Sequence, residues 1–119
     1  MTASNARDIV DRYFAAMAKK DFAAMRPLLH DDVIFRGVLG ATDGPQDYID
    51  GLRQTLAKVR EVRRLAIAAE GEHVFQVYEQ IFDEPAITVP VVQWLQIRDG
   101  RIASLRVYFD PRPLLAGRP

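Results

Sequence analysis

The first half of the chain repeats apolar residues at the period of an α-helix. A first apolar face is formed by Ile9, Val10, Tyr13, Phe14 and Met17. Asp21 is expected to cap the start of a second, short helix, and Pro27 to loosen its last turn. Pro45 suits the first turn of a third helix, whose apolar face consists of Tyr48, Ile49, Leu52, Leu56 and Val59. The pattern therefore predicts that the N-terminal half is helical.

After the third helix the apolar period shortens to two, which is typical of β-strands. Strands are predicted over residues 64–69 and 73–82, with a turn at Gly71 between them. In the first of these strands, one face is expected to carry Leu65, Ile67 and Ala69. The second strand is apolar on both faces, as is common at the centre of a sheet. Earlier in the chain, a short strand is predicted at residues 33–35, followed by a loop over residues 37–44.

The C-terminal end has the pattern of a long hairpin. Asp99-Gly100 tolerates the positive φ angles of a type I′ turn, and predicted strands over residues 88–98 and 101–109 flank it. Alternate residues of the first of these strands divide between two faces, with Trp94 on one and Gln93 on the other. The pattern alone does not assign either face to a cavity or to a partner subunit. Helices followed by strands predict an α+β fold with the helices on one sheet face.

The composition narrows the possible chemistry. The chain has 119 residues, enough for one domain with its own core, and 16 Lys and Arg balance 16 Asp and Glu. No charge excess therefore directs it to nucleic acid or to an anionic membrane. The absence of Cys excludes thiol catalysis, and the separated His30 and His73 predict no metal site and no cofactor. Residues 1–8 hold no signal-peptide core and the chain has no long apolar run, so we expect a cytoplasmic protein.

Four stretches resemble SnoaL-like and limonene-epoxide-hydrolase-like members of the nuclear transport factor 2-like superfamily. They are residues 9–17, 20–33 and 44–49, and the hairpin motif Asp-Gly-Arg-Ile-x-x-x-Arg-x-Tyr-Phe-Asp. The resemblance implies that residues 1–119 form a single SnoaL-like domain. In this fold a cone-shaped, curved, mixed or antiparallel sheet wraps around three N-terminal helices and encloses a deep apolar cavity. Many members form a homodimer through the outer sheet face, which the two-sided apolar pattern of the later strands also favours.

The catalytic residues of two branches of this superfamily are only partly matched. In the ketosteroid isomerase branch, the resemblance places Tyr13 at the position of the hydroxyl donor. The position of the proton-accepting Asp falls at or beside Gly37, which has no side chain. The Arg-Asp-Asp set of the epoxide hydrolase branch falls at Tyr78, Gln80 and Val107. Neither proton acceptor is present, so neither mechanism carries over intact.

Two residues are nevertheless candidates for catalysis. Asp110 ends the last predicted strand near the expected cavity mouth, where it could act as an acid or base in the manner of a SnoaL-like cyclase. Its alternative role is to cap a turn in the Asp-Pro-Arg-Pro sequence, and Asp43 offers the same two choices in its loop. Tyr13 could donate a hydrogen bond into the cavity, or it could be a core residue of the first helix.

Neutral and apolar residues are the candidates for ligand binding. Tyr78 and Gln80 lie two residues apart on one face of a predicted central strand, where they could orient a carbonyl or hydroxyl group. The remaining predicted lining residues are Phe14, Phe35, Leu52, Trp94, Leu105, Val107 and Phe109. Core packing explains the apolar residues equally well, and an outer sheet face would explain Tyr78 and Gln80.

These residues support two functions of different classes. The first is a SnoaL-like isomerase, cyclase or hydrolase acting on an apolar ring compound with a carbonyl, hydroxyl or epoxide group. The second is a non-catalytic protein that binds or sequesters such a compound. A carboxylate inside the pocket would favour the enzyme, whereas aspartates that only cap turns would favour the binding protein. The fold by itself does not choose between them.

Overall fold

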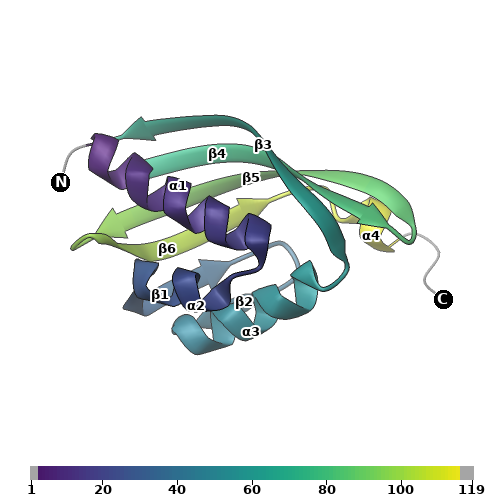
Figure 1. Cartoon of the computed structure of the whole chain (residues 1–119), viewed down its shortest axis with the longest axis horizontal. Coiled ribbons are helices and arrows are strands. Elements are labelled where there is room, and N and C mark those ends of the chain that lie inside the picture. The colour runs from purple at the N-terminus through teal and green to yellow at the C-terminus, as the bar shows by residue number, and fades with distance from the viewer. Residues whose placement is uncertain (1–2, 116–119) are drawn as a thin grey trace.

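The computed structural model describes residues 3–115 as a layer of helices on one face of a curved sheet (Figure 1). The helical elements are α1 (Ala3–Lys19), α2 (Phe22–Met25), a 3₁₀ turn η1 (Arg26–Leu28), α3 (Pro45–Leu56) and α4 (Arg112–Leu115). Among the described residues, no helix has the length and apolar character needed to cross a membrane.

The sheet has six strands and does not close on itself. They are β1 (Leu29–Arg36), β2 (Ala41–Asp43), β3 (Val59–Glu70), β4 (His73–Asp83), β5 (Ala86–Arg98) and β6 (Arg101–Tyr108). Their order is β2-β1-β6-β5-β4-β3, and β1 and β6 are the parallel pair. The other neighbours are antiparallel. The mixed, curved sheet with helices on one face confirms the predicted α+β architecture.

Proline and aspartate positions explain where the helices begin and end. The Asp21 carboxylate accepts a hydrogen bond from the Ala24 amide at 3.0 Å and so caps α2. Pro45 occupies the first turn of α3, as predicted. Pro27 does mark a change at the end of the second helix, but the chain there tightens into the 3₁₀ turn η1 instead of loosening. The predictions for Asp21 and Pro45 are confirmed, and the one for Pro27 is wrong in the direction of the change.

Two strand predictions need correction. The loop predicted over residues 37–44 contains β2, which pairs with β1 from Ile34 opposite Asp43 to Arg36 opposite Ala41. Three residues are too few to show a period in the sequence, so this edge strand had no signal. In β3, the register shifts between Arg64 and Ala66, and the extra residue Leu65 is 56% exposed instead of sharing the face of Ile67.

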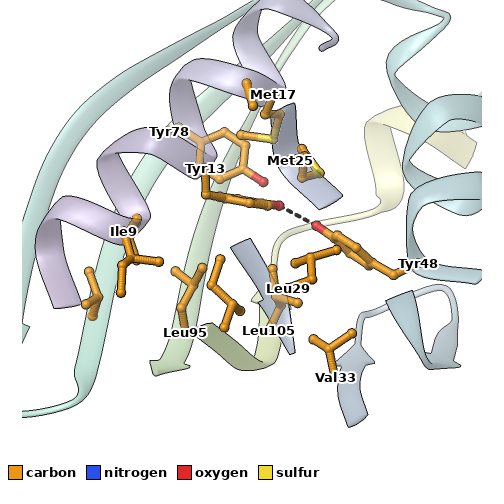
Figure 2. Close-up of a cluster of buried hydrophobic side chains, with 14 of the residues drawn as sticks. Ile9, Tyr13, Met17, Met25, Leu29, Val33, Tyr48, Tyr78, Leu95 and Leu105 are labelled. Atoms are coloured by element: carbon orange, nitrogen blue, oxygen red, sulfur yellow. Dashed lines mark hydrogen bonds between the residues drawn. The ribbon is translucent and has the colours of Figure 1, made fainter. Parts of the chain in front are cut away.

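The helical layer and the inner sheet face enclose the core. Tyr13 and Met17 of α1 belong to the same buried cluster as Leu95 and Leu105 of the sheet, and Figure 2 shows all four. The strand β5 alternates strictly, and its inward face carries Val91, Gln93, Leu95 and Ile97. This assigns the faces that the sequence left open: Gln93 points toward the helices, and Trp94 points away from them.

Candidate ligand-binding site

A cavity of about 480 Å³ lies between α3, the β1–β2 connection and the inner face of β4, β5 and β6. Its apolar wall includes Phe35, Leu52, Val91, Val107, Phe109 and Leu114. Polar side chains on the wall are those of Thr42, Tyr48, Gln54, Thr55, Tyr78, Gln80 and Gln93. A mostly apolar cavity with a few convergent polar groups is the usual form of a small-molecule site.

The cavity wall is electrically neutral. Among the described residues that line it, none is Asp, Glu, His, Lys or Arg. Its titratable groups are the phenols of Tyr48 and Tyr78, and burial is the main cause that raises the pKa of both. Both phenols therefore stay protonated at physiological pH. The wall offers hydrogen bonds but no group that exchanges a proton near neutral pH.

A chain of hydrogen bonds runs from the core to this wall. The Gln76 amide nitrogen donates to the Gln93 amide oxygen at 2.7 Å, and the Gln93 amide nitrogen donates to the Tyr13 hydroxyl at 3.4 Å. The Tyr13 and Tyr48 hydroxyls share the next hydrogen bond, drawn as the dashed line in Figure 2. Tyr13 itself is fully buried and does not line the cavity, so it acts through Tyr48.

Other polar groups of the wall are free to meet a ligand. Tyr78 is 3% exposed and Gln80 is 9% exposed, and neither side chain forms a hydrogen bond within residues 3–115. The buried Thr42 hydroxyl likewise has no partner among the residues described. Buried polar groups in native proteins are usually satisfied, so these groups point to a ligand or to water in the cavity.

The predicted ligand-binding residues divide into two sets. Those that line the cavity are Phe35, Leu52, Tyr78, Gln80, Val107 and Phe109. Phe14 instead packs edge-on against Tyr78, with ring centroids 5.7 Å apart, and supports that ring from behind. Leu105 is fully buried in the core. Trp94 is on the outer sheet face, where it stacks on Phe75 at 5.9 Å and cannot reach the cavity.

The candidate catalytic aspartate, Asp110, is likewise not among the described residues that line the cavity. Both oxygens of Asp110 contact the Arg112 side chain, at 2.7 to 3.0 Å, and one accepts from the Arg112 amide. These hydrogen bonds lower the pKa of Asp110 to about 2. Asp43 is similarly held by Arg36 at 3.0 Å. Both carboxylates thus have the turn and loop contacts that the sequence offered as their alternative roles.

Sequence reasoning missed most polar groups of the wall, among them Tyr48, Gln93 and Thr42. In the sequence, Tyr48 belongs only to the apolar face of the third helix, and its hydroxyl has no visible partner. Gln93 could be assigned only once the inward face of β5 was known, and Thr42 belongs to the missed strand β2. Among the described residues, no cluster of His, Asp or Glu forms a metal site.

A comparison with protein families identifies the family of the chain. The model of the SnoaL-like domain matches residues 10–105. The chain belongs to the SnoaL-like family. A comparison with curated proteins gave no match.

Solved structures show the same fold for this SnoaL-like domain. A protein of unknown function from Cytophaga hutchinsonii, described as NTF2-like, is 26% identical over 92% of this chain and 94% of its own, with a TM-score of 0.81. An epoxide hydrolase from M. tuberculosis, described as LEH-like, is 26% identical over 91% and 84%, with a TM-score of 0.78. A protein with a ketosteroid isomerase-like fold from Catenulispora acidiphila is 23% identical over 91% and 89%, with a TM-score of 0.75.

Proposed function

We propose that this SnoaL-like domain binds a small, uncharged, largely apolar ring compound without transforming it. The observation that carries the proposal is the neutral cavity wall, which within residues 3–115 holds hydroxyl and amide groups but no carboxylate, imidazole or amine. Apolar surface supplies the affinity, and the free polar groups of Tyr78 and Gln80 orient the ligand.

The competing function is a SnoaL-like isomerase, cyclase or hydrolase. The similarity to the LEH-like epoxide hydrolase favours it. General acid–base catalysis needs a group that titrates near the working pH within reach of the substrate. The aspartates that the sequence offered for this role, Asp110 and Asp43, are held by arginines outside the cavity wall. The binding function is therefore the better supported of the two.

Native mass spectrometry of the purified protein and equilibrium dialysis test the proposal together. We expect a neutral compound to co-purify or, for an empty protein, 9-fluorenone to bind in the cavity. Leu52→Arg should abolish that binding because it places a charge in the apolar wall, whereas Arg53→Leu on the same helix should not.

Turnover assays distinguish the binding function from the competing enzymatic function. Under the proposal, neither cyclohexene oxide nor a β,γ-unsaturated cyclic ketone is converted by the protein. Conversion that disappears in Asp110→Asn would establish an enzyme and overturn the proposal. A protein that binds no neutral ring compound would overturn both functions.

A further inference from the structure

The buried chain of hydrogen bonds behind Tyr48 bears on whether the Tyr48 hydroxyl donates to a ligand or accepts from it. We propose that Tyr48 is held as a hydrogen-bond donor to the ligand by Tyr13, Gln93 and Gln76. The site then selects compounds that carry an acceptor, such as a ketone, ester or ether oxygen, over compounds of the same shape that offer only a donor. This inference rests on the proposed binding function and narrows its ligand class.

The first step concerns the proton of Tyr13. Tyr13 is fully buried, and its hydroxyl has two hydrogen-bond partners within the described part of the chain: Gln93 and Tyr48. The Gln93 amide nitrogen is only a donor, so the Tyr13 oxygen accepts from it. The proton of Tyr13 is then left with one acceptor, which is the oxygen of Tyr48.

The second step concerns the orientation of the two amides. With Gln76 donating to Gln93, the atom left without a partner is the amide oxygen of Gln76. Turning both amides around would leave the Gln76 amide nitrogen unpaired instead. Buried N–H groups without partners are rarer than buried carbonyl oxygens without partners. The chain therefore runs in one direction, from β4 through β5 and α1 to α3.

The third step concerns the free end of the chain. Tyr48 accepts from Tyr13, so its own proton needs an acceptor elsewhere. Tyr48 is 4% exposed and lines the cavity, so that acceptor must come from the cavity contents. Burial raises the pKa of Tyr48 well above its usual range, which keeps this proton in place at physiological pH. A ligand with an acceptor satisfies the group, and one without an acceptor leaves it unpaired.

This arrangement differs from the role that the resemblance gave to Tyr13. Tyr13 does not line the cavity, and Tyr48 on α3 provides the contact instead. Tyr13, Gln93 and Gln76 are positioning residues, since each acts through the next. Their joint effect is to fix which way one hydroxyl points.

Three tricyclic compounds of nearly the same shape test whether the Tyr48 hydroxyl donates to the ligand. 9-Fluorenone carries only an acceptor, carbazole carries only a donor, and fluorene carries neither. In equilibrium dialysis we expect 9-fluorenone to bind about three- to tenfold more tightly than fluorene, the effect of one neutral hydrogen bond. Carbazole should bind no better than fluorene. The carbonyl stretch of bound 9-fluorenone should also shift to lower frequency than in hexane.

Variants separate the role of Tyr48 as the donor from the role of Tyr13 as a positioning residue. Tyr48→Phe should remove both the preference for 9-fluorenone and the frequency shift. Tyr13→Phe frees the Tyr48 oxygen as an acceptor, so carbazole binding should improve by about threefold or more, which a purely structural role of Tyr13 would not produce. Thr55→Val is the matched control, because the Thr55 hydroxyl already donates to Gly51 at 3.2 Å, and it should change neither result.

Each contrary result would overturn a specific claim of this inference or of the proposed function. Preference for carbazole in the parent protein would mean that the chain runs the other way. Preference for 9-fluorenone that survives in Tyr48→Phe would assign the donor role to another residue and overturn this inference alone. Failure of all three compounds to bind the parent protein would overturn the ligand class of the proposed function as well. If Tyr48→Phe does not fold, the frequency shift and Tyr13→Phe give the decision.

Discussion

The hydroxyls of Tyr78 and Tyr13 differ in their partners although both side chains are buried. Tyr78 forms no hydrogen bond within residues 3–115, whereas Tyr13 bonds to both Gln93 and Tyr48. Tyr78→Phe should therefore leave the free energy of unfolding nearly unchanged, because it removes no hydrogen bond within the described residues. Tyr13→Phe should lower that free energy by about 1–3 kcal/mol, because the buried Gln93 amide loses its acceptor. Urea unfolding of both variants measures the two effects, and equal stability losses would contradict the distinction.

Gly37 makes room for an aromatic ring of the cavity wall. A Cβ at this position would lie 2.7 and 2.9 Å from atoms of the Phe35 ring, whereas one at Gly40 would meet open space. Gly37→Ala should push the Phe35 ring from its place against Tyr48, where the centroids are 5.3 Å apart. We expect a loss of about 1–3 kcal/mol in stability, as in other overpacked sites, and weaker binding of 9-fluorenone. Gly40→Ala is the control, and an equal effect there would show that the loop, not the ring, responds.

Asp110 gives the protein a local response to acid. Hydrogen bonds from Arg112 lower its pKa from 3.8 to about 2, so the folded state holds the ionised form more strongly than the unfolded state does. The stabilisation is therefore present above about pH 4 and is lost as the pH falls toward 2. A carbon-13 NMR titration of the Asp110 carboxyl should show the low pKa, and Arg112→Gln should return it toward 3.8. Asp110→Asn should leave ligand binding unchanged, and a loss of binding would place Asp110 in the site.

Most elements of the fold could be predicted from local chemistry. Prolines and capping residues mark helix positions, and the period of two marks the long strands, so these signals survive without knowledge of the fold. The edge strand β2 and the bulge at Leu65 could not be predicted, because each depends on pairing with a neighbouring strand. For the same reason Trp94 could not be assigned to a sheet face until the register of β5 was known.

Glycine stabilises the β5–β6 turn at Gly100 but destabilises the helix α3 at Gly51. Asp99 and Gly100 have φ values of 54° and 75°, as a type I′ turn requires. Gly100→Ala should therefore lower the free energy of unfolding by about 1 kcal/mol. Gly51 lies inside α3, and a methyl group added there would meet open space, so Gly51→Ala should raise it by about 0.5–1 kcal/mol. Thermal unfolding of both variants checks the signs, and a stabilising Gly100→Ala would contradict the turn assignment.

The sequence predicted a mostly apolar cavity, but it predicted only some of the polar side chains on the cavity wall. Alternation along β4 and β6 brought Tyr78, Gln80 and Val107 to one inner wall, because residues two apart share a sheet face. The contact between Tyr13 and Tyr48 joins residues 35 positions apart, on two helices. Such a pairing depends on how α1 and α3 pack across the sheet, and no spacing in the sequence encodes it.

The outer sheet face leaves apolar side chains without a cover. Phe75, Val92 and Tyr108 are 41%, 43% and 52% exposed, and they surround Trp94 on three neighbouring strands. The Arg106 guanidinium lies over the Trp94 ring, 5.2 Å from its centroid, so apolar rings and a single cation share the centre of the patch. Contiguous apolar patches of this kind usually mark interfaces. We therefore propose that two copies of the domain pair through this face, leaving both cavities open on the opposite side.

Sedimentation at micromolar concentration should give a dimer of the 13.5 kDa chain. Val92→Lys should shift it to the monomer, because each dimer would bury two unpaired ammonium groups. Leu39→Lys is the control, since Leu39 is 60% exposed but lies on the cavity wall and not on the outer face of the sheet. It should leave the dimer intact. A parent protein that sediments as a monomer throughout this range would refute the pairing, and equal dissociation by both variants would place the interface elsewhere.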